Sequence, residues 1–317
     1  MNILIVGFGG MGCRHAQALL SLPTIPKIWA IEPNEAYFKT CLSNIGSNET
    51  QVTRIDWNEL KNLKLDFAIV ATSAEPRFDI VKKLIELGVK NLLVEKVVFQ
   101  ANQQFKEITE LANKNGVRAH CNFVHREVPN YKQLREQIKS SGLPITMLVQ
   151  GGDFGIGCNG LHYMDLFEYI SGSKLKLTSS LLHQHPNGNK RGAQYKELLG
   201  SVSGVSVKGD KFAMSSDDRH HGAIIINILL GDKIYQFNEG SQTELVIAGN
   251  MTQQTEFKLI PTSRLTHKIA AEIMEGKTVL PSIHDTWNIH EQFFNVLNPV
   301  FGCSNVNDQN AVLCPIT

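Results

Sequence analysis

Residues 3–12 read ILIVGFGGMG, an apolar run that leads directly into spaced glycines. The run predicts a buried strand, and the glycines fit the G-x-G-x-x-G pattern of a turn from strand to helix. Gly7 permits the sharp turn, Gly9 lets backbone N–H groups approach a pyrophosphate, and Gly12 lets the helix pack closely on the sheet. A pyrophosphate would then rest at the positive end of the helix. The stretch therefore predicts a dinucleotide site.

An acidic residue stands where the dinucleotide pattern requires one. Glu32 follows a predicted strand over 27–31, about 20 residues beyond the last glycine. A carboxylate there accepts hydrogen bonds from a ribose 2′-hydroxyl and repels a 2′-phosphate, so it favours NAD over NADP. The alternative is a solvated acid before Pro33. Gly10 and Met11 begin the predicted helix and complete the predicted cofactor-binding turn.

Composition narrows the class of protein. The 317 residues are 42% hydrophobic and 19% charged, which suits a globular protein of two domains. The formal net charge of +1 offers no basic surface for nucleic acid, so we expect a small-molecule partner. No uncharged apolar run reaches the roughly 20 residues that cross a bilayer. The six cysteines show no C-x-x-C spacing, so we expect reduced thiols and a cytoplasmic protein.

Strand and helix patterns alternate over residues 1–121. The predicted strands cover 3–6, 27–31, 67–71, 91–94 and 117–121, and the predicted helices cover 10–22, 34–43, 77–87 and 103–113. Continuous apolar strands separated by such helices indicate a parallel sheet with both faces covered. The sequence therefore predicts an α/β fold whose first domain, residues 1–121, is a doubly wound Rossmann domain.

The pattern changes from residue 122 onward. Helices are expected at 130–139, 161–170, 263–274 and 284–297, a strand at 145–149, and a series of strands over 175–257. Breaks such as Gly231-Asp232 and Glu239-Gly240 are typical of hairpins. Residues 122–317 are therefore expected to form an α+β domain on a mostly antiparallel sheet.

Polar residues follow the predicted strands at the edge where parallel sheets bind ligands. Thr72 and Ser73 follow the third of these strands and either line the cofactor groove or cap the next helix. Glu95 and Lys96 follow the fourth, where a lysine would lie near a nicotinamide. The alternative for Lys96 is a surface lysine at a strand end.

These residues resemble the Gfo/Idh/MocA family, named for glucose–fructose oxidoreductase, inositol dehydrogenase and rhizopine catabolism. The resemblance covers the chain in order and rests on the glycine turn, Ala71-Thr72-Ser73, Glu95-Lys96, Arg126-x-x-Pro129 and His162-x-x-Asp165. It implies a Rossmann domain followed by an open β-sheet domain that often mediates oligomerisation. It also implies NAD(P)-dependent oxidation or reduction at a carbon of a sugar, cyclitol or related polyol. By this resemblance Lys96 and His162 match the family's catalytic lysine and histidine.

Two positions depart from the family pattern. Val97 stands where the family has proline, and a cis Lys96–Val97 bond would cost roughly 2.5–4 kcal/mol, so we expect a trans bond. Cys158 stands where the family commonly has an aspartate, and a thiol cannot orient an imidazole as a carboxylate does. Asn159, beside it, can bind a substrate hydroxyl but cannot act as a base.

His162 and Asp165 share a face of one predicted helix. His162 would exchange the hydroxyl proton while Asp165 orients its ring, or else the histidine caps the helix and Asp165 forms a local salt bridge. Asn122 and Arg126 are expected to contact substrate hydroxyls or a carboxylate, and the alternative for Arg126 is a solvated arginine. The predicted substrate-binding set is Lys96, Asn122, Arg126, Asn159, His162 and Asp165.

No metal site is predicted, because the adjacent His220 and His221 would point to opposite faces of a strand. The sequence thus predicts an NAD-dependent oxidoreductase that forms a homo-oligomer through its second domain. The alternative is an NAD-binding sensor or assembly protein without redox turnover. A third possibility is carbon–oxygen bond cleavage with a retained NAD.

Overall fold

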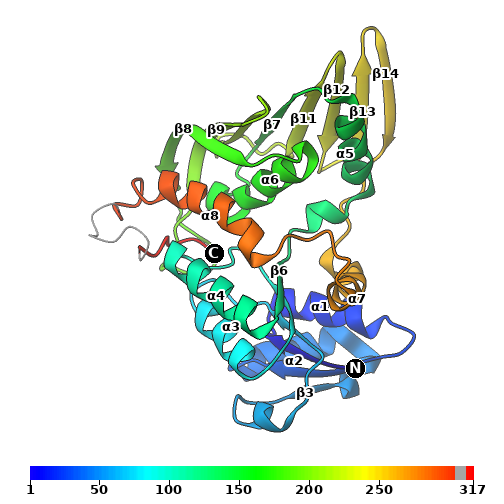
Figure 1. Ribbon diagram of the computed structural model, residues 1–317, viewed down its shortest axis with the longest axis vertical. Coiled ribbons are helices and arrows are strands. Elements are labelled where there is room, and N and C mark those ends of the chain that lie inside the picture. The colour runs from blue at the N-terminus through cyan, green and yellow to red at the C-terminus, as the bar shows by residue number, and fades with distance from the viewer. Residues whose placement is uncertain (304–311) are drawn as a thin grey trace. The chain divides into compact units, whose positions relative to one another are not determined.

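The structure is a computed structural model that describes residues 1–303 and 312–317, with the backbone alone for residues 47–49. The chain divides into two compact units (Figure 1). Unit 1 comprises Met1–Phe99, Gln103–Asn122 and Ile260–Asp285, and unit 2 comprises Gln100–Asn102, Phe123–Leu259 and Thr286–Thr317.

Unit 1 contains a parallel sheet of six strands in the order β3-β2-β1-β4-β5-β6. The strands are β1 (Asn2–Val6), β2 (Lys27–Ile31), β3 (Val52–Arg54), β4 (Phe67–Val70), β5 (Asn91–Val94) and β6 (Arg118–Cys121). This order is that of a dinucleotide-binding Rossmann fold, which confirms the predicted fold of the first domain. The sequence pattern missed β3, because the strand has three residues of which only Val52 is buried.

The helices of the Rossmann fold lie between these strands, close to the expected ranges. They are α1 (Gly10–Leu20), α2 (Glu35–Ile45), α3 (Arg77–Glu86) and α4 (Asn102–Asn115). Helix α1 contacts α2, while Lys82 of α3 forms an ion pair of 2.5 Å with Glu107 of α4. The central strands β1, β4 and β5 are buried almost throughout, as coverage of both faces of the sheet requires.

A segment far along the sequence also belongs to unit 1. The range Ile260–Asp285 includes α7 (Thr266–Glu275), which contacts α1, β5 and β6. Cys121 donates its backbone N–H to the carbonyl oxygen of Pro281 at 3.0 Å, so this segment continues the edge of the sheet beyond β6. The single domain boundary expected after residue 121 does not account for the placement of Ile260–Asp285 in unit 1. Local sequence patterns carry no information on which sheet a distant helix covers.

Unit 2 is built on an eight-stranded sheet in the order β14-β13-β12-β11-β7-β10-β9-β8. The strands are β7 (Ile145–Gly151), β8 (Leu175–Gln184), β9 (Leu198–Ser206), β10 (Lys211–Ser216), β11 (Ile225–Leu230), β12 (Lys233–Asn238), β13 (Thr243–Ala248) and β14 (Met251–Glu256). Among these, β7 and β10 pair in parallel and the other neighbours are antiparallel. The mostly antiparallel sheet that the sequence predicts is therefore confirmed.

Helices α5 (Pro129–Ser141), α6 (Ile156–Ser171) and α8 (Ile283–Leu297) accompany this sheet (Figure 1). Aromatic contacts join helices to strands in its core, such as Phe167 of α6 with Phe212 of β10 at 5.5 Å between ring centroids. Helix α6 begins five residues earlier than the expected 161. The earlier start matters, because the added turn contains Cys158 and Asn159.

Candidate active site

Two glycines of the turn, Gly9 and Gly10, have open space beside them, whereas Gly7 and Gly12 are closely packed. Gly7 has a φ of +86°, and a Cβ built on it would lie 2.8 Å from the backbone nitrogen of Thr72. A Cβ on Gly12 would overlap the carbonyl oxygen of Gly7, whereas Gly9 and Gly10 have open space around the position of a Cβ. The first N–H groups of α1 have no partner within the helix. This geometry fits a pyrophosphate at Gly9 and Gly10.

Glu32 lies at the end of β2 and is fixed to the glycine turn. Its Oε2 accepts a hydrogen bond from the N–H of Phe8 at 2.9 Å, and its Oε1 accepts one from Asn34 at 3.0 Å. The carboxylate also borders a pocket of about 620 Å³ that is lined by Ile31, Glu32, Pro33, Arg54, Ile55, Asp56, Trp57 and Glu59. The acid is thus at the edge where a ribose would lie in a Rossmann fold.

The same pocket contains an arginine that the sequence analysis missed. Arg54 donates from Nε to the carbonyl oxygen of Glu32 at 2.9 Å and from Nη2 to that of Pro33 at 3.0 Å. An arginine near this position is the residue type that accommodates a 2′-phosphate. The pocket therefore offers one group that favours NAD and one that tolerates NADP.

Thr72 and Ser73 follow β4, beside the glycine turn. The hydroxyl of Thr72 donates to the carbonyl oxygen of Ser73 at 2.9 Å. Helix α3 begins at Arg77 after Pro76, without a side-chain cap, so neither residue caps it. The capping alternative therefore does not hold, and the role of Thr72 and Ser73 in a cofactor groove stays a prediction.

Arg77, which sequence reasoning also missed, connects the ends of β4 and β5. Its side chain is fully buried, and its guanidinium donates hydrogen bonds to the carbonyl oxygens of Thr72 and Val97. A guanidinium suits this position because its donors form a rigid planar fork. No local pattern distinguishes such an arginine from a surface arginine at the start of a helix.

Lys96 is buried at the carboxyl end of β5, which argues against the surface alternative. The peptide bond between Lys96 and Val97 is cis, so the expected trans bond is wrong. The trans bond is expected from the intrinsic preference of a non-proline peptide bond. The structure adds tertiary contacts, because the Val97 side chain is completely buried and its carbonyl oxygen binds Arg77.

Glu95, the residue before Lys96, belongs to a buried network of hydrogen bonds. Its Oε1 accepts from Nδ2 of Asn122 at 2.6 Å and lies 3.1 Å from Nε2 of His15. On the other side of the ring, Nδ1 of His15 lies 2.8 Å from Oγ1 of Thr266, whose hydroxyl donates to the carbonyl oxygen of Thr262. The His15 ring therefore links Glu95 to Thr266 within this network.

This network determines the ionisation of Glu95. Burial acts to raise the pKa of Glu95, but the hydrogen bonds from His15 and Asn122 outweigh it and lower the pKa to about 2. Glu95 and Asn122 thus support the loop that carries Lys96 from inside unit 1. Their predicted contacts with cofactor and substrate stay predictions.

In unit 2, helix α6 has a narrow row of residues that are partly exposed to solvent, which we call its accessible stripe. Every residue of this helix is buried except Cys158, Asn159 and His162. Positions i, i+1 and i+4 of a helix lie on one side, so the three side chains share a face. The sequence-predicted His162 and Asn159 are therefore brought together with Cys158, the residue that replaces the family aspartate.

Arg126 and Asp165 bind each other. The guanidinium donates from Nε to Oδ2 at 2.9 Å and from Nη2 to Oδ1 at 2.7 Å, and the Asp165 side chain is buried. Burial disfavours the charge on Arg126, but the attraction of Asp165 outweighs it and raises the pKa of the guanidinium. Asp165 therefore forms a salt bridge, but with Arg126 and not with a local partner, and the Arg126 side chain is only 15% exposed.

A pocket of about 570 Å³ adjoins the start of α6. It is lined by Asp153, Phe154, Gly155, Cys158, Asn159, His185, Asn187, Gly188, Asn189, Lys190, Arg191 and Glu197. Asn159 donates from Nδ2 to the carbonyl oxygen of Phe154 at 2.5 Å, which leaves its amide oxygen to accept a bond from a ligand. Polar side chains dominate this wall, as suits a polyhydroxylated ligand.

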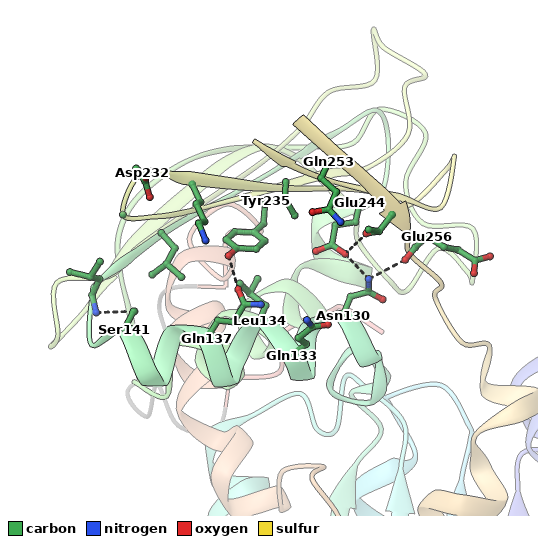
Figure 2. Close-up of a pocket in the computed structure, with 16 residues that line it drawn as sticks. Asn130, Gln133, Leu134, Gln137, Ser141, Asp232, Tyr235, Glu244, Gln253 and Glu256 are labelled. Atoms are coloured by element: carbon green, nitrogen blue, oxygen red, sulfur yellow. Dashed lines mark hydrogen bonds between the residues drawn. The ribbon is translucent and has the colours of Figure 1, made fainter. Parts of the chain in front are cut away.

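A second pocket in unit 2, of about 630 Å³, lies between α5 and strands β12–β14 (Figure 2). Its polar side chains bind one another: Tyr235 donates to Gln137 at 2.6 Å, and Asn130 donates to Glu244 at 2.7 Å. None of the sequence-predicted site residues is among its lining residues. Its size alone therefore does not make it the candidate active site.

Over residues 1–303 and 312–317, no three His, Cys, Asp or Glu side chains are grouped as metal ligands would be. His220 and His221 lie in the loop before β11 and not within a strand. None of the helices described is both long and apolar enough for a membrane span.

Comparison with solved structures shows the fold. The chain is 14% identical to a super-repressor mutant of Gal80p from Saccharomyces cerevisiae, with a TM-score of 0.74 and 97% of each chain covered. It is 13% identical to UDP-N-acetylglucosamine 3-dehydrogenase GnnA from Acidithiobacillus ferrooxidans, with a TM-score of 0.76, covering 93% of this chain and 96% of that one. A mutant of KijD10, a 3-ketoreductase from Actinomadura kijaniata in complex with TDP-benzene and NADP, is 12% identical, with a TM-score of 0.74 and coverage of 92% and 95%.

Comparison with family models gives a match for the N-terminal part of the chain. No curated protein sequence matches the chain. Residues 1–123, however, match the family described as "Oxidoreductase family, NAD-binding Rossmann fold". These residues contain the glycine turn, Ala71-Thr72-Ser73 and Glu95-Lys96, three of the motifs on which the resemblance rests. Residues 1–123 thus match the model of the Gfo/Idh/MocA family of oxidoreductases.

Proposed function

We propose that the chain is an NAD(P)-dependent oxidoreductase acting on a hydroxyl or keto carbon of a sugar, cyclitol or related small polyol. The observation that carries the proposal is the open backbone at Gly9 and Gly10, within residues that match an oxidoreductase family. Gly7, Gly9, Gly10, Met11 and Gly12 would hold the pyrophosphate, Glu32 the ribose, and Thr72 and Ser73 the groove. The bound nicotinamide would accept or return a hydride.

Lys96 and His162 are assigned the proton chemistry. In the oxidation direction one of them removes the proton from the substrate hydroxyl, and the other stabilises the negative charge that develops on that oxygen. In the reverse direction the same groups return the proton to the new hydroxyl. Asn159 would bind a neighbouring hydroxyl, since it lies on the accessible stripe of α6 with His162.

NAD is favoured as the cofactor because the Glu32 carboxylate is fixed at the turn by Phe8 and Asn34. The proposal is tested by following the nicotinamide absorbance with NAD and NADP over a panel of aldoses, cyclitols and keto-sugars. Lys96→Ala should abolish turnover and leave NAD binding nearly unchanged. Lys90→Ala, at the exposed residue before β5, serves as the control. An unaltered rate in Lys96→Ala would remove Lys96 from the mechanism.

A second candidate is an NAD-binding sensor or assembly protein without redox turnover. Two observations favour it: Cys158 replaces the aspartate common in the family, and the fold is also that of a super-repressor mutant of Gal80p. The same assay distinguishes the candidates. Saturable NAD binding by calorimetry, with no turnover of any substrate in the panel, would favour the sensor.

We also propose that a second copy of the chain binds one face of the unit 2 sheet. Leu148, Val205 and Leu229 are 39%, 40% and 37% exposed, and they alternate with buried neighbours along β7, β9 and β11. Apolar side chains on an exposed sheet face are typical of interaction surfaces. Sedimentation velocity should show an oligomer that Leu148→Asp dissociates, whereas a monomeric wild type would refute the proposal.

A further inference from the structure

Ionisable side chains from different elements of unit 2 lie behind His162. The ring of His125, in the short helix Val124–Glu127, lies 5.2 Å from that of His162 between centroids. Nε2 of His125 lies 3.7 Å from Oε1 of Glu239, which directly follows β12. Oη of Tyr163, on α6, donates to Oε2 of Glu239 at 3.3 Å. The ring of His125 thus neighbours both Glu239 and His162.

The cluster is held firmly. The side chains of His125 and Glu239 are only 10% and 12% exposed. The ring of His125 also packs on Tyr131 at 6.1 Å and on Tyr163 at 5.5 Å between centroids. Aromatic contacts with two residues therefore fix the orientation of the His125 ring. A change in the charge of Glu239 then acts on a ring that is held in place.

The charge state of the cluster changes at one group near neutral pH. Burial raises the pKa of Glu239 to about 7, although the hydrogen bond from Tyr163 opposes it. Burial also lowers the pKa of His125 to about 4, so this ring is neutral. The same cause raises the pKa of the other two groups that face Glu239, Tyr163 of α6 and Tyr131 of α5, well above their usual range.

We propose that Glu239 is a positioning residue for His162 and acts through His125. Its protonated carboxyl group is neutral, and its ionised form places a negative charge against the far side of the His125 ring. The proton that Glu239 loses passes to solvent. The 3.7 Å separation is longer than a hydrogen bond, so the coupling is electrostatic. The proposal rests on the proposed function, in which His162 handles the substrate proton.

Nuclear magnetic resonance of the histidine rings tests this coupling without any substrate. The His162 signal is assigned by its loss in His162→Asn, and its chemical shift is followed from pH 5 to pH 9, a range of about two units on either side of the Glu239 pKa. The wild type should show an inflection near pH 7, the pKa of Glu239, in addition to any change that the His162 ring itself undergoes. The inflection should disappear in Glu239→Gln, which keeps the size and polarity of the side chain.

Two further variants make the result specific. His125→Phe keeps an aromatic ring between Tyr131 and Tyr163, and should also remove the inflection if the coupling passes through His125. Glu244→Gln, which changes another glutamate of the same sheet, should retain it. An inflection that persists in Glu239→Gln would overturn the proposal, and one that persists in His125→Phe would overturn the route through His125.

The pH dependence of turnover then separates this proposal from the proposed function. If the chain oxidises a polyol, kcat/KM should change near pH 7 in the wild type, and the change should disappear in Glu239→Gln. A chain with no turnover at all would refute the oxidoreductase while the ring signals still decide on Glu239. A profile that Glu239→Gln leaves unchanged would contradict the positioning role.

Discussion

The guanidinium of Arg77 donates a hydrogen bond to the carbonyl oxygen of Val97, the residue that follows Lys96. The same side chain binds the carbonyl oxygen of Thr72, so one buried arginine fixes the loops after β4 and β5. Lysine has a single ammonium group and cannot reproduce the fork. Arg77→Lys should therefore lower the free energy of unfolding by about 3 kcal/mol, as expected for loss of a buried charged hydrogen bond. Urea denaturation measures this change.

Arg118 provides the matched control for Arg77. It also donates to two carbonyl oxygens, those of Ile273 and Met274, but from an exposed position on β6. Water can replace those bonds, so Arg118→Lys should cost less than about 1 kcal/mol. Equal losses in the two variants would contradict the role of burial in holding the Lys96 loop.

Glu32 should govern the choice between the two nicotinamide dinucleotides. Its carboxylate repels a 2′-phosphate, whereas Arg54 in the same pocket can attract one. Glu32→Ser removes the repulsion, and should strengthen NADPH binding relative to NADH by about tenfold, or ~1.4 kcal/mol. Fluorescence titration with both reduced dinucleotides gives the ratio. Asp56→Asn, in the same pocket, should leave the ratio unchanged, and an unaltered ratio in Glu32→Ser would exclude Glu32 from the ribose site.

The buried pair of His15 and Glu95 should make unit 1 sensitive to acid. The pKa of Glu95 is about 2 in the folded chain, below its ordinary value of 4.5, so the unfolded chain takes up this proton first as the pH falls. The stability that ionised Glu95 contributes is complete above the unfolded value and is lost between pH 4.5 and 2. The expected loss is on the order of 3 kcal/mol.

Unfolding free energies measured in urea at pH 6 and pH 3 check this prediction, since ionised Glu95 is stabilising above about pH 4.5. Glu95→Gln should have a smaller difference between the two values, because the group no longer titrates. Glu110→Gln, on the exposed side of α4, should behave like the wild type. Identical differences in all three proteins would show that Glu95 is not the acid-sensitive group.

Most of unit 1 is predictable from the sequence because the signals for its strands and helices are local. The apolar runs, the glycine spacing and the position of Glu32 are all set within one strand–helix–strand unit, and the observed strand order agrees with them. Residues 260–285 could not be placed, since only tertiary contacts with α1, β5 and β6 bring them to unit 1.

The candidate site was predictable to a smaller extent. Lys96 and His162 stand within short motifs, and the resemblance assigns them a catalytic role that stays a prediction. No local motif marks Arg77 as a buried arginine, and no spacing links Glu239 to His125. The cis bond after Lys96 was mispredicted for the same reason, because the contacts that surround Val97 are tertiary.

The early start of α6 depends on the carboxylate of Glu197. Its Oε1 accepts from the N–H of Gly157 at 2.6 Å, and its Oε2 accepts from that of Cys158 at 3.2 Å. A negative charge at the first turn of a helix satisfies free N–H groups and interacts favourably with the helix dipole. Glu197 therefore holds the turn that carries Cys158 and Asn159.

Glu197→Ala should lower the free energy of unfolding by about 2 kcal/mol, the upper range for loss of a helix cap. Amide hydrogen exchange should also accelerate at Gly157 and Cys158, since their N–H groups lose their acceptor. Glu59→Ala removes a glutamate that accepts from the backbone of Asp56 at an exposed position, and should cost less than about 0.5 kcal/mol. Unchanged exchange at Cys158 in Glu197→Ala would mean that packing against the sheet, and not this carboxylate, fixes the first turn of α6.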